Sequence, residues 1–282
     1  MNYAARKRLS DSLSGIVLYG FLITISCFTL LPFVWMLSTS FKPADEIFAI
    51  PPIVISPNFN LSSYTYLFQE YGILRNLWNT FIIAFFSTAL SLFFCSLAGF
   101  AFAKYNFPGK AKIFAFVLGT MVIPFVVTMV PLYIIMRDLH WIDQYQAIII
   151  PGAASAFGIF FMRQYMSSIS DEIMDAARMD GASEFSIYWR VVVPIIAPGL
   201  TSLGLILFMG SWNSFLWPLI ILKTQANLTL PLVIRSMIGP VGRTVYDVQM
   251  AASIISLIPL LIIFLFFQRR YFEGITAGAV KG

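Results

Sequence analysis

The acidic side chains of this chain are densest in one segment. Only 11% of the 282 residues are charged, yet acids crowd the stretch that includes DAARMDGASEFSIYWRVVVPIIAP at residues 175–198. Between residues 164 and 189 five acids face one arginine, a net charge of −4: Asp171, Glu172, Asp175, Asp180 and Glu184 against Arg178. Electrostatic complementarity suits such a segment to docking a basic partner. A solvated loop is the alternative, and composition alone favours neither.

Other groups that could carry chemistry are scarce. His140 is the single histidine and has no cysteine or histidine companion, which is a poor basis for a metal site. Cys27 and Cys95 lie in apolar stretches, as buried thiols do, so we expect no disulfide. The chain has neither a G-x-x-x-x-G-K-[ST] loop nor a glycine-rich dinucleotide turn. We therefore expect no catalytic residue, metal or cofactor in this chain, and any energy must come from a partner.

Long apolar stretches make up most of the sequence. Hydrophobic residues account for 59% of the chain, and 28 residues are phenylalanine. Six windows without Asp, Glu, Lys, Arg or His reach or approach the roughly 20 residues that a membrane helix needs. We predict an all-α, polytopic membrane protein with six transmembrane helices, at about residues 15–37, 77–102, 113–135, 145–164, 195–222 and 249–268. Because these windows hold no ionisable group, a proton-driven transporter is disfavoured.

The basic residues indicate how the helices are oriented. With the N-terminus in the cytoplasm, 12 of the 18 Lys and Arg residues fall on the cytoplasmic side and 6 on the outer side. This bias predicts that both termini and the acidic segment are cytoplasmic. The basic residues lie between apolar segments rather than along one face, so we expect no nucleic-acid binding. The outer segments 38–76 and 223–248 contain several prolines, and we predict an ordered cover and an irregular projecting element.

Local signals in the acidic segment predict two helices joined by a glycine turn. Ser170 is a helix cap followed by acids in the first turn, and that helix should run to about Asp180. Gly181 is a natural left-handed stop, and Ser183 can cap the next helix. In the second helix an apolar stripe recurs at helical spacing: Phe185, Tyr188, Trp189, Val192 and Val193.

The same segment resembles the EAA loop of ABC-importer permeases. Its pattern is an acid and two alanines, two further residues, Asp-Gly-Ala, an aromatic residue and then proline. Asp175 stands where the family usually has Glu, and its side chain is one methylene shorter. The stretches SFKPADEIF, PPIVISPNFNLSSY, FAFAKYNFPGK, WNSFLWPLI and ITAGAVKG are similar to the maltose-type carbohydrate permeases, in particular to the smaller, six-span permease.

This resemblance implies a type I ABC-importer permease fold and several partners. It implies a second, homologous permease, a dimer of ATPases that binds ATP and Mg²⁺, and an external solute-binding protein that delivers a sugar. The residues implied to couple to the ATPase are Asp175, Ala176, Ala177, Met179, Asp180, Gly181 and Ala182. The tail is also implied to reach the ATPase through Ala279, Val280, Lys281 and Gly282, and the outer loop near 227–248 to probe the binding protein.

We expect three parts along the chain. Residues 1–74 hold the first transmembrane helix and the long outer loop, residues 75–270 a five-helix permease core, and residues 271–282 a cytoplasmic tail. The core includes the coupling loop at residues 165–194, called the acidic loop below. In the fifth span a sugar could be contacted by Ser211, Trp212, Asn213 and Trp217. Packing against the partner permease explains these four residues equally well.

The expected function is that of a non-catalytic permease subunit in an ATP-driven, binding-protein-dependent carbohydrate importer of the bacterial inner membrane. The direction of transport and the sugar class follow from the resemblance alone. A stand-alone channel or facilitator for small polar solutes is the alternative, but it leaves the acidic loop and the tail without a role. An intramembrane enzyme lacks the paired catalytic groups that it would need.

Overall fold

The computed structural model describes the backbone of residues 3–238 and 245–279, and within these residues the secondary structure is entirely helical. The contacts divide the chain into two compact units. One comprises Met1–Tyr71 with Met237–Ile255, and the other comprises Gly72–Ser236 with Ser256–Gly282. The absence of strands, together with long apolar helices, confirms the predicted all-α class.

The first unit contains α1 (Tyr3–Thr39), η1 (Ala44–Glu46), α2 (Ser62–Glu70) and the beginning of α14 (Tyr246–Ala279). Within α1, residues 15–39 form an apolar helix long enough to cross a membrane, and none of its most apolar window is buried. Its large apolar side chains point outward, as they do in a helix surrounded by lipid.

Within the segment 38–76, for which the sequence predicts an ordered outer cover, side-chain contacts fix residues 41–59. The Glu46 carboxylate accepts hydrogen bonds from the Ser56 hydroxyl at 2.5 Å and from the Asn58 amide at 2.7 Å. The Phe41 and Phe59 rings stack with centroids 4.7 Å apart. These contacts connect the short helix η1 to the proline-rich chain that follows it.

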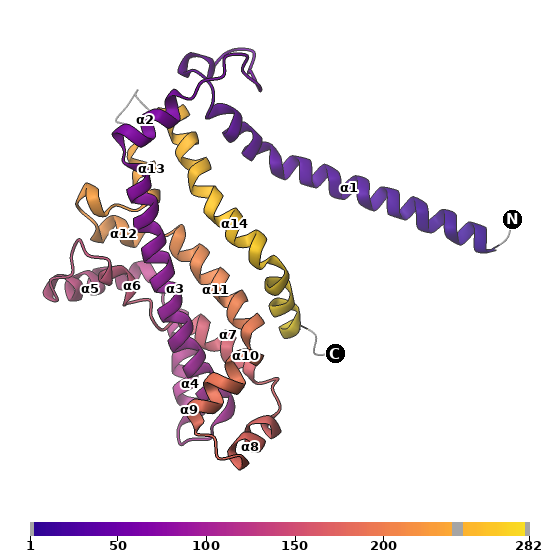
Figure 1. Ribbon diagram of the computed structural model, residues 1–282, viewed down its shortest axis with the longest axis vertical. Coiled ribbons are helices and arrows are strands. Elements are labelled where there is room, and N and C mark those ends of the chain that lie inside the picture. The colour runs from indigo at the N-terminus through magenta and orange to yellow at the C-terminus, as the bar shows by residue number, and fades with distance from the viewer. Residues whose placement is uncertain (1–2, 239–244, 280–282) are drawn as a thin grey trace. The chain divides into compact units, whose positions relative to one another are not determined.

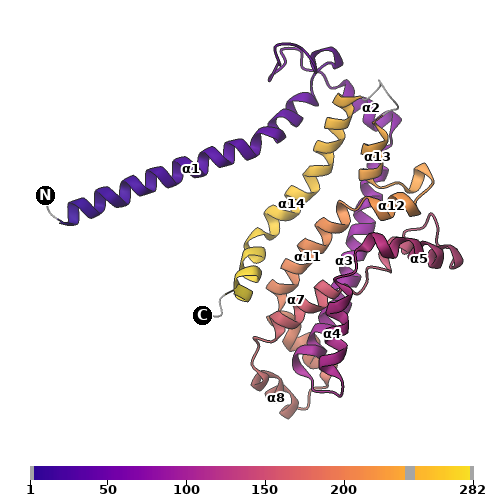
Figure 2. The same cartoon turned by 180° about the vertical axis from the view of Figure 1, so that it is seen from behind.

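The second unit is built around α3 (Ile73–Lys104), and α7 (Ala156–Met166) and α11 (Ala197–Trp212) pack along it (Figures 1 and 2). The remaining helices of this unit are α4 (Lys110–Thr120), α5 (Phe125–Asp138), α6 (Gln146–Ile149), α8 (Asp171–Met179), α9 (Glu184–Ile187), the π-helix η2 (Tyr188–Val192), α10 (Val193–Ile195), α12 (Leu216–Ile221), η3 (Gln225–Asn227) and α13 (Leu230–Ser236).

Three of the six predicted spans are not continuous helices, which corrects the sequence-based expectation. The predicted span 113–135 breaks before Pro124, where α4 and α5 meet at 96°. The span 145–164 breaks at Pro151-Gly152 into α6 and α7, and the span 195–222 breaks after Trp212 into α11 and α12. Proline lacks an N–H and forces the residue before it out of the helical region, so hydropathy alone overestimates continuity at the first two breaks.

Apolar length nevertheless agrees with a multi-pass protein. Among the described residues, three helices are individually long and apolar enough to cross a membrane: residues 15–39 of α1, α3, and residues 246–272 of α14. The count rises to five if each bent pair of helices is one span. The second such pair joins residues 184–195 to α11 at 79°, between Pro194 and Pro198.

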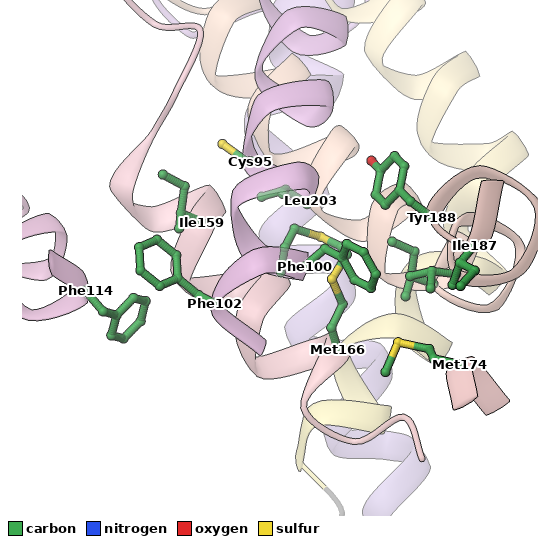
Figure 3. Close-up of a cluster of buried hydrophobic side chains, with 13 residues drawn as sticks. Cys95, Phe100, Phe102, Phe114, Ile159, Met166, Met174, Ile187, Tyr188 and Leu203 are labelled. Atoms are coloured by element: carbon green, nitrogen blue, oxygen red, sulfur yellow. The ribbon is translucent and has the colours of Figure 1, made fainter. Parts of the chain in front are cut away.

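Glycines bring α3 and α7 into backbone contact. A methyl group added at Gly99 of α3 would lie 2.6 Å from the Met162 Cβ and 2.9 Å from the Arg163 backbone nitrogen. A methyl group added at Gly158 of α7 would lie 2.7 Å from the Cys95 sulfur. Small residues permit this close approach in membrane helices, where packing rather than water exclusion drives association. A cluster of buried apolar side chains surrounds the α3–α7 contact (Figure 3).

We predict that Gly99→Ala destabilises the protein, whereas Gly119→Ala does not. The methyl group added at Gly99 has no room between α3 and α7, and this overpacking should lower the free energy of unfolding by about 1–3 kcal/mol. Gly119 lies in α4 with no atom within 4 Å of an added methyl. Thermal unfolding of the detergent-solubilised protein, followed by its size-exclusion peak, measures the difference. Equal midpoints for the two variants would contradict the close packing of α3 and α7.

Candidate functional site

The acidic loop folds locally as its sequence predicts. The Ser170 hydroxyl accepts a hydrogen bond from the Glu172 backbone nitrogen at the start of α8, and the Ser183 hydroxyl accepts one from the Ser186 backbone nitrogen at the start of α9. Between the two helices Gly181 has φ +79°, in the left-handed region that favours glycine. The predicted arrangement of helix, glycine turn and second helix is therefore confirmed.

Arg178 ties the two helices of the acidic loop together across the glycine turn. Its guanidinium donates to Glu184 at 2.8 Å and 3.2 Å, and to Asp175 at 2.7 Å. The Tyr105 hydroxyl donates to the same Glu184 carboxylate. The hydrogen bonds from Arg178, and then from Tyr105, hold the pKa of Glu184 below its usual value. Burial, reinforced by the Glu184 carboxylate, raises the pKa of Tyr105 to about 12, so this hydroxyl remains a donor at neutral pH.

A second contact anchors the loop to the end of α3. The Lys104 ammonium donates to the Asp171 carboxylate at 2.7 Å and also to the Ile169 carbonyl. The side chain of Lys104 is only 5% exposed, so this ion pair is partly shielded from water. The hydrogen bond from Lys104 is the main reason why the pKa of Asp171 is lowered.

These contacts revise the interpretation of the loop's negative charge. Asp171, Asp175 and Glu184 are paired within the chain, and among the described residues only Glu172 and Asp180 of the five acids form no ion pair. Sequence reasoning missed Lys104 and Tyr105 because they lie 67 and 79 positions from their partners. The sequence offers one indication of their role: a basic and an aromatic residue follow directly after the predicted span 77–102.

Two large apolar side chains are strongly exposed on the acidic loop. The side chain of Met179 is 88% exposed at the end of α8, and that of Phe185 is 64% exposed in α9. The residues predicted to couple to an ATPase divide into two sets. Asp175, Ala176, Met179, Asp180 and Gly181 are exposed, whereas Ala177 and Ala182 pack against the buried cluster.

The predicted apolar stripe of the second helix is only partly correct. Tyr188 and Val192 are buried, but Phe185 and Trp189 are exposed and contact each other edge to face. The turn at Tyr188–Val192 is π-helical, with more residues per turn than an α-helix, so the spacing of an α-helical stripe does not continue through it. Met174 of α8 and Ile187 of α9 are buried and join the loop to the apolar cluster around α3 and α7 (Figure 3).

A cavity of about 590 Å³ lies in the second unit beside the middle of α3. Phe125 and Trp217 contribute aromatic rings to its wall, with centroids 6.0 Å apart, and the Trp217 indole donates to the Ala147 carbonyl at 2.9 Å. All its polar side chains are hydroxyl-bearing: Ser87, Thr88, Ser91, Thr128, Ser155, Ser211 and Ser214.

Two of the four residues predicted to contact a sugar, Ser211 and Trp217, line this cavity. Trp212 is 1% exposed and stacks on Phe208, while the Asn213 amide donates to the Met209 carbonyl and ends α11. No ligand contact tests these four residues, so their role stays a prediction.

The segment 223–230 is held from two sides. The Asn79 amide of α3 donates to the Ala226 and Leu228 carbonyls at 2.9 Å and 3.0 Å. On the other side the Asp143 carboxylate accepts from the Lys223 and Thr224 backbone nitrogens at 2.7 Å and 3.1 Å. The loop implied to meet a binding protein, 227–248, is thus fixed at its start, while its residues 239–244 lie outside the described residues. Of the predicted tail contacts, Ala279 ends α14, and Val280, Lys281 and Gly282 also lie outside the described residues.

Comparison with known proteins identifies the family. Residues 95–276, which include α7, the acidic loop and α11, match the family described as the binding-protein-dependent transport system inner membrane component. The chain belongs to this family. It is therefore a membrane subunit of a transport system, with several apolar helices, rather than an enzyme.

Relatives match the permease over almost its whole length. It is 36% identical to the arabinooligosaccharides transport system permease protein AraQ of Bacillus subtilis, across 96% of this chain and 97% of AraQ. It is 31% identical to the lactose transport system permease protein LacG of Rhizobium radiobacter, across 98% of each chain. A crystal structure of a bacterial ABC transporter involved in the import of the acidic polysaccharide alginate aligns with a TM-score of 0.82 and 25% identity, over 92% of this chain and 97% of that chain.

We predict that Arg178→Gln loosens the acidic loop. The change removes the guanidinium group that bonds both Asp175 and Glu184. The backbone amides of residues 181–187 should therefore exchange hydrogen for deuterium several-fold faster than in the unchanged protein. Arg178→Lys should give partial protection because an ammonium keeps the charge but not the planar fork. Arg190→Gln is the matched control, because Arg190 is exposed on η2. Exchange as slow in Arg178→Gln as in Arg190→Gln would contradict the bracing role.

Proposed function

We propose that this chain is a permease subunit of an ATP-driven, binding-protein-dependent carbohydrate importer in a bacterial inner membrane. In this proposal a second, homologous permease completes the pathway, and a dimer of ATPases binds ATP and Mg²⁺. The observation that carries the sugar class is the match, over nearly the full length, to AraQ and LacG, whose names state the transport of sugars. The cavity lined by hydroxyl groups and aromatic rings supports the same class of solute.

The contacts of the acidic loop support a mechanical link to the pathway. An ATPase that closes against Met179 and Phe185 would push on α8 and α9, which Arg178 joins. Because Lys104 and Tyr105 attach these helices to the end of α3, the push would reach α3 itself. Ser87 lies 17 residues along that helix, about 25 Å away at the α-helical rise, in the cavity wall. A displacement of the loop would therefore move one wall of the cavity.

The proposed topology has six crossings, with both termini and the acidic loop in the cytoplasm. Three crossings are the continuous helices of α1, α3 and α14, and a fourth is the bent pair of α4 and α5. The fifth is α11 with α12, which follows the cytoplasmic residues 184–195 after the 79° bend. The sixth is the segment broken into α6 and α7. The distribution of 12 basic residues inside and 6 outside supports this orientation.

We predict that Met179→Asp uncouples ATP hydrolysis from transport. A carboxylate at the centre of an apolar contact with an ATPase would have to be desolvated without a partner. Because Met179 is 88% exposed, the change should leave the permease folded. In the purified complex, the stimulation of ATP hydrolysis by sugar-loaded binding protein should fall at least several-fold.

Ser168→Asp provides a charge-matched control at an exposed position in the same loop, and it should keep the stimulation. Undiminished stimulation in Met179→Asp would refute the docking assignment. A wild-type complex that contains no ATPase, or whose ATP hydrolysis does not respond to any sugar-loaded binding protein, would refute the proposed function.

A further inference from the structure

Three hydroxyl groups of α3, those of Ser87, Thr88 and Ser91, depart from the pattern of Thr80 and Ser96 on the same helix. Thr80 and Ser96 donate to the carbonyl four residues earlier, at 2.7 Å and 2.6 Å, as Ser and Thr commonly do in membrane helices. Ser87 and Thr88 do not. Their oxygens are buried, and neither has a hydrogen-bond partner among the described residues.

These two residues lie where a ligand could satisfy them. Ser87 and Thr88 line the cavity, and Ser91, one turn further along α3, lines it too. We call these three residues the hydroxyl wall. Ser91 has only a long contact to the Cys95 sulfur, at 3.5 Å, so its hydroxyl also retains capacity for a ligand. Contact with a ligand requires the Ser87 and Thr88 hydroxyls to turn toward the cavity by rotation about χ1, a change between staggered rotamers.

The chemistry of the whole cavity limits what can bind. No Asp, Glu, Lys, Arg or His is among the residues that line it. Hydroxyl groups donate and accept, which matches the hydroxyls of a sugar, and the rings of Phe125 and Trp217 offer apolar surface to the C–H face of a sugar ring. A carboxylate or ammonium group would lose water here without gaining a counter-ion from this chain. The volume of about 590 Å³ lies within the range of small-molecule sites.

We propose that the hydroxyl wall is a sugar-contacting surface of this chain itself, and that it is selective for uncharged sugars. The proposal rests on the proposed import of carbohydrate and deepens it. It places the contact on α3, in addition to Ser211 and Trp217 of the predicted set. It also separates this permease from its structural neighbour, which is involved in the import of an acidic polysaccharide.

The test uses the complete transporter complex, with Ser87→Cys in a Cys27→Ser background. Cys27 is exposed and must be removed, whereas Cys95 is 0% exposed and can remain. Three methanethiosulfonate reagents serve as probes: one with a glucosyl group, one with a sulfonatoethyl group and one with a trimethylammonium group. Each labelling rate is divided by the rate of the same reagent with 2-mercaptoethanol, so intrinsic reactivity cancels. Thr88→Cys is the second probe position if the first variant fails to assemble.

The control is Thr201→Cys on α11. Thr201 lines a different, almost wholly apolar groove between α3, α11 and α14, which a polar reagent should not enter. We expect the glucosyl reagent to label Ser87→Cys at least about tenfold faster than either charged reagent, because only the charged groups must be desolvated without a partner. Thr201→Cys should be labelled slowly by all three reagents.

Two results would overturn the proposal. The first is glucosyl labelling of Ser87→Cys no faster than that of Thr201→Cys, because the hydroxyl wall would then not face a sugar-accessible pathway. The second is labelling by either charged reagent as fast as by the glucosyl reagent, because the pathway would then not select against charge. In the same preparation, stimulation of ATP hydrolysis by sugar-loaded binding protein tests the proposed function separately. If the stimulation is present and either of the two results is obtained, the sugar-contacting role of the hydroxyl wall is refuted while the proposed function stands.

Discussion

The attachment of the acidic loop to the end of α3 is the contact on which the proposed coupling depends. Lys104 reaches Asp171 from a nearly buried position, and Tyr105 reaches Glu184, which Arg178 holds against α8. Exposed ion pairs contribute little by themselves, but a network that shares one carboxylate restricts several side chains at once. In the proposed coupling, a loop held in this way would move with α3 instead of folding aside when an ATPase presses on it.

Rigidity along α3 comes from packing rather than charge. In lipid, helices gain little from hiding apolar surface, so close backbone approach must provide the association. Gly99 and Gly158 permit that approach between α3 and α7, and Phe100, Met162 and Met166 fill the space around it. The cavity wall, the glycine contact and the anchor of the acidic loop all lie on this one helix.

The charge pattern of the acidic loop shows how tertiary contacts change the meaning of a sequence motif. A net charge of −4 suggests an acidic docking surface. The structure pairs Asp171, Asp175 and Glu184 within the chain and leaves the apolar side chains of Met179 and Phe185 exposed beside them. Protein interfaces commonly combine apolar and polar groups in this way. Three of the five acids therefore serve to hold the loop in its conformation through ion pairs within the chain.

The sequence alone determined the features that depend on near neighbours in the chain. Ser170, Gly181 and Ser183 predicted the two helices of the acidic loop and the turn between them, because caps and left-handed turns are decided by a few adjacent residues. Hydropathy predicted α1, α3 and α14, whose apolar runs are uninterrupted by helix-breaking turns. Only the tertiary structure decided which acids are paired, where predicted spans bend, and which hydroxyls line the cavity. Those outcomes depend on residues such as Lys104 and Asp171, which are distant in sequence and meet only when α3 packs against the rest of its unit.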